Sequence, residues 1–184
     1  MSTGATVEGN ERPRLFLALE VPDDVVAQLV EWGKEQLVRG RAPSSFHVTL
    51  AFLGVRPLSE LGDIVEALCE EAAAAAPFTL APVRYRETRS VGMLVLEDPT
   101  GHAARLADGV QSRLERLGCY RRETRPWLPH VTVVRFRDRP RLRPSLPEIA
   151  PFAPSGAAAF LSRLSPSGAR YEVIQSCALG TPGG

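Results

Sequence analysis

The hydrophobic positions of this chain follow two periods, one typical of strands and one typical of helices. Short apolar runs bounded by turn residues predict strands, and amphipathic runs that begin with a capping or acidic residue predict helices. The predicted strands cover residues 14–21, 47–53, 78–86, 91–96, 130–136, 157–164 and 170–179. The first predicted helix opens at Asp23-Asp24, the second runs from a Ser59 cap to Ala76, and the third covers residues 101–117 after a Thr100 cap.

This order of elements predicts an α+β fold. Strands outnumber helices, and no succession of βαβ units calls for a parallel sheet. A chain of 184 residues, 44% of them hydrophobic, suits one compact domain or two small lobes that share a core. We expect a disordered leader over residues 1–12, a single domain over 13–180 and a tail over 181–184. The proline-rich stretch 138–154 predicts a loop.

Two of the predicted strands carry the same polar triplet. His47-Val48-Thr49 and His130-Val131-Thr132 contain two of the three histidines in the chain and are separated by close to half of its length. This spacing indicates an internal duplication in which each half supplies one such strand. Side chains alternate along a strand, so the histidine and threonine of each triplet share one face while the valine points into the core.

An imidazole beside a hydroxyl suits the hydrolysis of a phosphodiester. The reaction needs a base that activates water and an acid that protonates the departing oxygen, and an imidazole with a pKa of about 6.5 serves either purpose near neutral pH. Thr49 and Thr132 can donate hydrogen bonds to phosphate oxygens as negative charge builds up. Strict alternation puts Arg135, five residues after His130, on the opposite face of the strand from that histidine.

Other interpretations of the histidines and cysteines are weaker. A lone histidine on an apolar strand is more often a packed core residue, but two copies in matching settings argue against that reading. His102 lacks such a setting and is expected at a solvent-facing helix start. Neither the histidines nor the cysteines have the spacing of a zinc site, so we expect no metal site. A glycine-rich phosphate loop with its lysine is also missing from the sequence.

The charge is unevenly distributed although the formal net charge is only +1. Eight arginines but only two acidic residues lie between Arg121 and Arg143. Such a cluster would raise the local concentration of an anionic ligand, whereas a solvated basic face is the alternative. The arginines that we consider as possible RNA-binding residues are Arg121, Arg122, Arg125, Arg137, Arg139, Arg141 and Arg143.

Cysteine usage and the N-terminal sequence predict a cytoplasmic protein. Cys69, Cys119 and Cys177 are odd in number and widely spaced, without a CxxC pair, which predicts reduced thiols. The first residues, MSTGATVEGNER, lack the basic and apolar regions of a signal peptide. No apolar run reaches the about eighteen residues that a membrane span needs, so we expect no membrane partner.

The paired HxT motifs resemble those of the 2H phosphoesterase superfamily, and most closely the RNA 2′,3′-cyclic phosphodiesterase (2′-5′ RNA ligase) family. RLFLALEVP resembles the opening strand of this family, FHVTLAFLG its first motif, RPWLPHVTVVR its second and SRLSPSGARYEVI its closing segment. The resemblance covers most of residues 14–179. Residues 83–97 depart from it, because they lack the phenylalanine and tryptophan that many relatives carry there.

The resemblance implies a fold and a reaction. The implied fold has two similar α+β lobes whose antiparallel sheets face each other across a central groove, with helices on the outside. In the implied reaction His47 protonates the leaving 3′ oxygen and His130 activates water, while Thr49 and Thr132 hold the phosphate and Arg135 assists with charge or substrate contact. The implied product is a 2′-phosphate formed from a terminal RNA 2′,3′-cyclic phosphate without any cofactor.

The resemblance also implies partners, and two alternative functions stay open. The expected partners are RNA ends or nucleoside cyclic phosphates, bound by a monomer. The same groups could join or cleave 2′-5′ linkages in RNA, or the chain could be a nucleotide- or RNA-binding module without turnover. The presence of both histidines favours an enzyme, because a binding module could lose either one.

Overall fold

The computed structural model describes residues 14–166 and 168–180, which form an α+β fold. The strands in this part of the chain are β1 (Arg14–Glu20), β2 (His47–Gly54), β3 (Ala81–Glu87), β4 (Val91–Glu97), β5 (His130–Arg135), β6 (Gly156–Ser165) and β7 (Gly168–Cys177). The α-helices are α1 (Asp23–Gln36), α2 (Leu61–Ala74) and α3 (His102–Arg116), and a 3-10 turn, η1 (Leu58–Glu60), precedes α2. The predicted order of strands and helices is confirmed. The predicted leader over residues 1–12 and tail over 181–184 lie outside the described residues.

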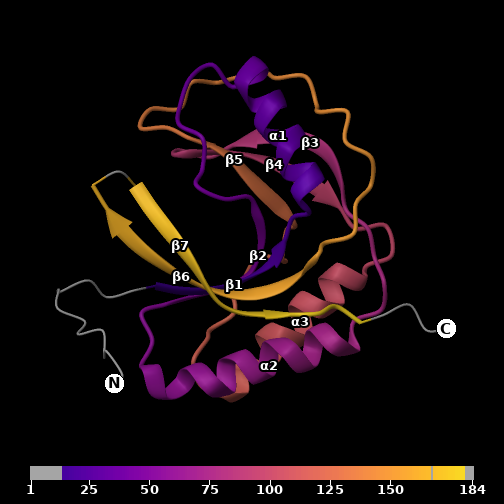
Figure 1. Ribbon diagram of the computed structural model, residues 1–184, viewed down its shortest axis with the longest axis vertical. Helices are drawn as coiled ribbons and strands as arrows, with labels where there is room; N and C mark the ends of the chain where they lie inside the picture. Colours follow the sequence, from indigo (N-terminus) through magenta and orange to yellow (C-terminus); the bar gives the residue numbers. More distant parts are fainter. Residues whose placement is uncertain (1–13, 167, 181–184) are drawn as a thin grey trace, which may run out of the picture.

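The strands form one antiparallel sheet that consists of two halves (Figure 1). The strand order is β3-β4-β5-β2-β1-β6-β7. At the centre, β2 and β5 are paired at Val48 and Val131, whereas β1 and β6 are paired along the whole of β1. The α+β class and the antiparallel strands are confirmed. The two expected sheets are halves of one continuous sheet, and one residue pair joins the three-stranded half to the four-stranded half.

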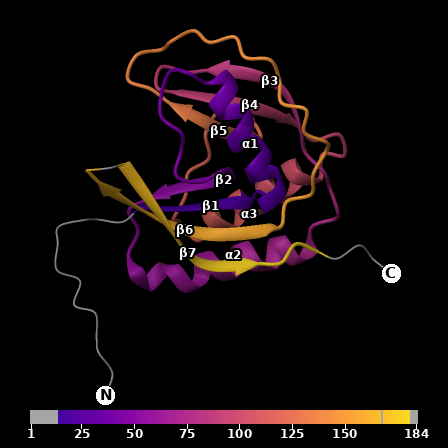
Figure 2. The same ribbon diagram turned by 45° about the horizontal axis from the view of Figure 1, so that its top comes forward.

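The helices cover each half of the sheet on its core side. α2 and α3 pack together beneath the four-stranded half, where α2 contacts β6 and β7 and α3 contacts β2 (Figures 1 and 2). α1 lies against β5 of the three-stranded half. No helix in the ranges 14–166 and 168–180 is long and apolar enough to cross a membrane.

Residues of β1 and β6 alternate between two hydrophobic layers, as the period of a strand requires. On β1, Leu17 points into the main core with the helices, whereas Phe16 and Ala18 point to the opposite face of the sheet. The layer on that opposite face consists of Phe16, Ala18, Ala158 and Phe160, with Tyr171 packed against it. The face of the four-stranded half away from the helices is therefore lined with aromatic side chains.

Helix boundaries differ from their predictions at two positions. Ser59 is not a capping residue: it lies inside η1, and α2 begins at Leu61 without a side-chain cap. The alanine-rich end of α2 stops at Ala74, before the predicted end. α3 begins at His102, and the predicted capping residue, Thr100, does accept a hydrogen bond from the His102 N–H at 3.2 Å.

The prediction of reduced thiols is wrong for two of the three cysteines. Cys69 of α2 and Cys177 of β7 form a disulfide, with their Cα atoms 5.1 Å apart, while Cys119 is a buried free cysteine. The two bonded cysteines are 108 residues apart in sequence and meet because α2 packs on β6 and β7. Spacing along the chain contains no sign of such a tertiary contact.

Candidate active site

The two HxT triplets lie side by side at the centre of the sheet. Their central residues, Val48 and Val131, are opposite each other in antiparallel register, and each is only 1% exposed. This register sets the histidine of each triplet opposite the threonine of the other. Because the valines point into the core, both histidines and both threonines project from the opposite face, which we call the histidine face. The structure therefore brings the four predicted side chains together.

The diagonal placement of the two histidines leaves room for one phosphate. His47 and His130 lie across a diagonal of the strand pair, and diagonal neighbours in an antiparallel pair are about 7–8 Å apart. Displacement at phosphorus places the attacking and leaving oxygens roughly in line on opposite sides of the phosphorus atom. One imidazole on each side of the phosphate suits that geometry.

A β-bulge follows each triplet at the same position. The register of β2 against β1 skips Leu50, and the register of β5 against β4 skips Val133, each the third residue after its histidine. A bulge adds one residue and re-aims the side chains that follow it. Arg135 and Phe52 thereby join the histidine face. The matching bulges support the internal duplication inferred from the sequence.

Arg135 reaches the histidine face, contrary to the expectation from strict alternation. Val133 and Val134 are adjacent in sequence and both buried, as a bulge allows, so the next side chain emerges beside the histidines. Arg135 Nη2 donates to the Tyr171 hydroxyl at 3.4 Å, and the Tyr171 ring packs edge-on against the His47 ring with centroids 5.5 Å apart. The pair of adjacent valines before the arginine is the sequence signal for this arrangement.

His47 is enclosed by aromatic rings, and this enclosure changes its titration. The ring centroids of Phe16, Tyr171 and Phe160 lie 4.9, 5.5 and 5.9 Å from that of His47. Burial, followed by the positive charge of Arg135 and then by His130, lowers the pKa of His47 from 6.5 to about 4. The His47 imidazole is therefore neutral at neutral pH.

The two imidazoles have different hydrogen-bond partners at Nδ1. His130 Nδ1 lies 2.8 Å from the Leu128 carbonyl oxygen. A carbonyl only accepts, so Nδ1 carries the proton, and Nε2 of the neutral ring keeps its lone pair. His47 Nδ1 lies 3.2 Å from the Ser45 hydroxyl, which can either donate or accept. His130 is therefore oriented as a proton acceptor, whereas the contact of His47 allows either tautomer.

Several residues of the histidine face, beyond the aromatic rings of Phe16 and Phe160, were not among the predicted site residues. Ser45 and Tyr171 contact the His47 ring, and Phe52 is 54% exposed. The register sets Phe52 opposite Phe16, which belongs to the aromatic layer around His47. Two adjacent apolar residues, Leu50 and Ala51, precede Phe52 and are the sign in the sequence that a bulge turns Phe52 onto this face. No local pattern in the sequence identifies Tyr171.

The third histidine lies outside this site. His102 stands at the start of α3, with Nδ1 2.7 Å from the Pro77 carbonyl oxygen. Within residues 14–166 and 168–180, no group of three or more His, Cys, Asp or Glu side chains is arranged to hold a metal ion.

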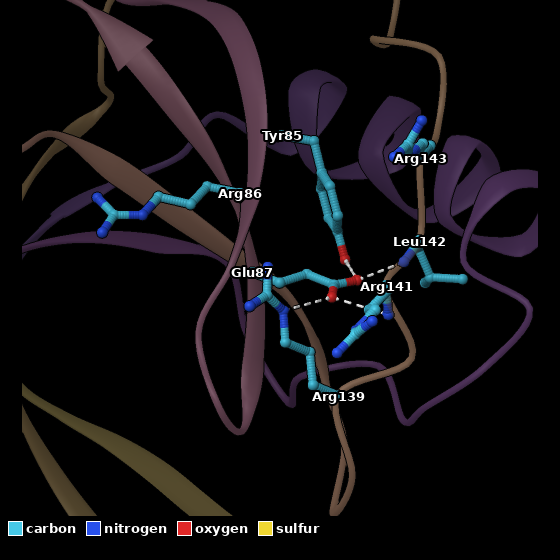
Figure 3. Close-up of a pocket in the computed structure, with 7 residues that line it drawn as sticks. All are labelled: Tyr85, Arg86, Glu87, Arg139, Arg141, Leu142 and Arg143. Carbon is cyan, nitrogen blue, oxygen red and sulfur yellow. Dashed lines mark hydrogen bonds and ion pairs between the residues drawn. The ribbon is translucent and has the colours of Figure 1, made fainter.

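Part of the predicted arginine cluster lies at the carboxyl end of β5. Arg137 and Arg139 line a groove of about 560 Å³ that also includes Arg135. Arg139, Arg141 and Arg143 line a neighbouring cavity of about 340 Å³ (Figure 3), and no histidine is among its lining residues. Of these two cavities, only the larger one includes a residue of the histidine face, Arg135.

The other predicted arginines precede the amino end of β5. Arg122 is bound to α3 by ion pairs with Asp108 and Glu115. Arg121 and Arg125 are exposed in the segment between α3 and β5. The structure therefore does not bring Arg121, Arg122 and Arg125 together with the groove.

Comparisons with known proteins identify the family of the chain. Residues 21–162 match the family model of the 2′-5′ RNA ligase superfamily. The RNA 2′,3′-cyclic phosphodiesterase of Thermus thermophilus is 31% identical over 179 residues, which cover 90% of each chain. The RNA 2′,3′-cyclic phosphodiesterase of Escherichia coli is 29% identical over 133 residues, 68% of this chain and 73% of its own.

Solved structures of related proteins share the fold. TT0787 of Thermus thermophilus superposes with a TM-score of 0.75 at 31% identity, covering 90% of this chain and 97% of its own. Escherichia coli LigT in its apo form superposes with a TM-score of 0.77 at 22% identity, covering 94% of this chain and 100% of its own.

Proposed function

The chain belongs to the 2′-5′ RNA ligase superfamily, and we propose that it hydrolyses the terminal 2′,3′-cyclic phosphate of RNA to a 2′-phosphate. The observation that carries this proposal is the antiparallel pairing of the two HxT triplets, which puts both imidazoles and both hydroxyls on one face of the sheet. The Thermus thermophilus and Escherichia coli relatives are RNA 2′,3′-cyclic phosphodiesterases, which supports hydrolysis of the cyclic phosphate.

His130 acts as the general base in the proposed reaction. Its Nδ1 proton is held by the Leu128 carbonyl group, so the lone pair on Nε2 is available to remove a proton from water. The water oxygen then forms a bond to phosphorus while the bond between phosphorus and the 3′ oxygen breaks.

His47 acts as the general acid that protonates the departing 3′ oxygen. With a pKa of about 4, the ring carries little positive charge at neutral pH without a substrate. A bound phosphate adds negative charge beside the ring and opposes the effects of Arg135 and His130, which raises the pKa. Substrate binding therefore prepares the acid, and the two histidines take opposite protonation states.

Hydroxyl and guanidinium groups hold the reacting phosphate. Thr49 and Thr132 donate to its non-bridging oxygens, and Arg135 offsets the charge that builds up in the transition state. The choice of the 3′ oxygen as leaving group rests on the family resemblance. The proposed reaction uses no metal ion and no other cofactor.

The organisation and location of the protein belong to the same proposal. We propose a single domain over residues 13–180 that acts as a monomer on RNA ends or nucleoside cyclic phosphates in the cytoplasm. The one core that spans both halves of the sheet supports a single domain.

The Cys69–Cys177 disulfide argues against a reducing compartment, because such compartments keep most thiols reduced. Alkylation of free thiols at the moment of cell lysis tests the location: a fully oxidised pair would contradict it.

An assay with a cyclic-phosphate-ended oligoribonucleotide tests the proposed reaction. We expect the purified protein to convert the cyclic end to a 2′-phosphate, and His102→Ala, which changes a histidine outside the site, to retain this activity. Joined products would instead indicate a ligase, and bound but unchanged substrate would indicate a binding module. A 3′-phosphate product would contradict the assigned leaving group.

A further inference from the structure

We infer that the groove beside the histidine face binds the single-stranded RNA that leads to the reacting phosphate, an inference that rests on the proposed function. The groove holds about 560 Å³. Its charged lining residues, which define what we call the arginine groove, are Arg39, Arg41, Arg135, Arg137, Arg139 and the acidic Asp138. Arg39 and Arg41 belong to the loop between α1 and β2 and were not among the predicted RNA-binding residues.

Arg135 belongs both to the arginine groove and to the histidine face. The Arg135 side chain contacts Tyr171 beside His47, and its backbone pairs with Arg41 through hydrogen bonds of 2.7 and 2.8 Å. Gly40 permits this close approach, because its φ is +119° and a Cβ there would lie 2.5 Å from the Val134 side chain. The wall of the groove is therefore set by backbone pairing at the end of β5.

Two of the groove arginines have charges that no acidic residue in the described ranges neutralises. Arg39 and Arg137 form no ion pair with any residue in the described ranges, and both are exposed. Arg139 pairs with Glu87 at 3.2 Å, but its side chain remains 55% exposed. Arginines without an ion-pair partner in a concave surface attract a polyanion. A phosphate backbone suits such arginines better than an acidic peptide does.

The segment that carries Arg137 and Arg139 is anchored to the sheet. The Glu87 carboxylate, whose side chain is 2% exposed, accepts hydrogen bonds from Arg139 Nε and from the backbone N–H groups of Arg141 and Leu142 (Figure 3). The Tyr85 hydroxyl donates to the same carboxylate at 3.1 Å. Glu87 is therefore occupied in holding the loop against β3 and does not compete with a ligand in the groove.

The chemistry of the substrate explains why a strand would enter this groove. A 2′,3′-cyclic phosphate is the 3′ terminus of its RNA, so the remaining nucleotides leave the site in a single direction. Arg135 stands where the histidine face meets the groove, and each further nucleotide brings one more backbone phosphate. Contacts of guanidinium groups with that backbone would be independent of sequence.

Two paired-arginine variants test the inference. Arg39→Ser/Arg137→Ser removes two charges from the groove without disturbing Arg135 or the Glu87 anchor. Arg121→Ser/Arg125→Ser removes the same charge from the other end of β5, roughly 17 Å away along the strand. Each variant is assayed on a nucleoside 2′,3′-cyclic phosphate and on an oligoribonucleotide with the same terminal nucleotide. Equilibrium binding of an oligoribonucleotide that already ends in a 2′-phosphate is measured over a range of salt concentrations.

We expect the groove variant alone to lose its preference for the oligonucleotide. Its kcat/KM for the oligonucleotide should fall toward the mononucleotide value, and the slope of log K against log salt should become less negative by about 1.4, or about 0.7 per lost phosphate contact. Equal slopes for the parent and the groove variant, or equal changes in both variants, would overturn the inference. The inference would also be overturned if the folded groove variant lost as much turnover of the mononucleotide as of the oligonucleotide. If the parent turns over neither substrate, the proposed function fails, and the salt slopes still decide whether the groove binds RNA.

Discussion

Arg135 and Phe52 occupy equivalent positions on the two strands that carry the HxT triplets. Each is the fifth residue after a histidine, and each lies beyond a β-bulge that turns it onto the histidine face. The antiparallel pairing at Val48 and Val131 puts them at opposite ends of the site. The groups proposed to move protons are thus arranged symmetrically, whereas a cation flanks one end and an exposed aromatic ring flanks the other.

Replacement of Phe52 by alanine should weaken substrate binding without affecting stability. Stacking of a base on an aromatic ring contributes about 1–3 kcal/mol, so we expect KM for a nucleoside 2′,3′-cyclic phosphate to rise about 5- to 150-fold with kcat little changed. Phe52→Trp should restore KM. Leu58→Ala, at a residue that is 81% exposed in η1, is the control for loss of exposed apolar surface. An unchanged KM in Phe52→Ala would contradict stacking at this end.

The two histidines should behave as one unit. We expect His47→Ala and His130→Ala each to lower kcat by about 10²–10⁴, because each removes a proton-transfer group. The double variant should lose far less than the product of the two single effects, since either loss already disables the concerted step. Steady-state kinetics on a cyclic-phosphate substrate, with thermal melting to check the fold, measures this. Multiplicative losses would show that the residues act independently.

The titration of His47 should respond to Arg135. The pKa of His47 lies at about 4 because of burial first and the charge of Arg135 second, so Arg135→Gln should raise it while burial keeps it below 6.5. Inorganic phosphate should also raise the pKa of His47 in the parent protein. NMR titration of the ring protons, assigned with His47→Gln, measures these shifts. A pKa of His47 near 6.5 in the parent protein would contradict the proposal that substrate binding is needed to protonate this general acid.

Removal of metal ions should leave activity unchanged. The proposed reaction assigns proton transfer to the histidines and charge stabilisation to the threonines and Arg135, so no step depends on a Lewis acid. Dialysis against a chelator followed by the oligonucleotide assay tests this. Activity that is lost on dialysis and restored by a divalent cation would replace the two-histidine reaction with a metal-assisted one.

Reduction of the Cys69–Cys177 disulfide should destabilise the fold. The bond closes a loop of about one hundred residues, for which the chain-entropy relation gives a loss of about 4–5 kcal/mol in the free energy of unfolding. Urea unfolding with and without a reductant measures the change. Cys69→Ser/Cys177→Ser should unfold at lower urea and show no further effect of the reductant. If the parent protein unfolded at the same urea concentration with and without the reductant, the disulfide would have no stabilising role.

The sequence predicts those parts of the structure that repeat locally. The two HxT triplets stand out because an identical pattern occurs twice, and alternation along each strand assigns His47 and Thr49 to one face. Strict alternation assigns Arg135 to the wrong face, because the bulge at Val133 adds a residue to the strand. Two adjacent valines, Val133 and Val134, are the sign of this bulge in the sequence, and both are buried. Tyr171 could not be assigned, since its contacts depend on how the hairpin of β6 and β7 lies over the site.

The sheet order also has a consequence for synthesis of the chain. β2 is complete at Gly54, but its outer neighbour, β5, begins only at His130. At translation rates of 5–20 residues per second, one edge of β2 stays unpaired for roughly 4–15 s on the ribosome. An unpaired edge is a template for association between chains. The strand that carries His47 is therefore an expected point of contact for chaperones, and the site is completed only when late-made β5 closes that edge.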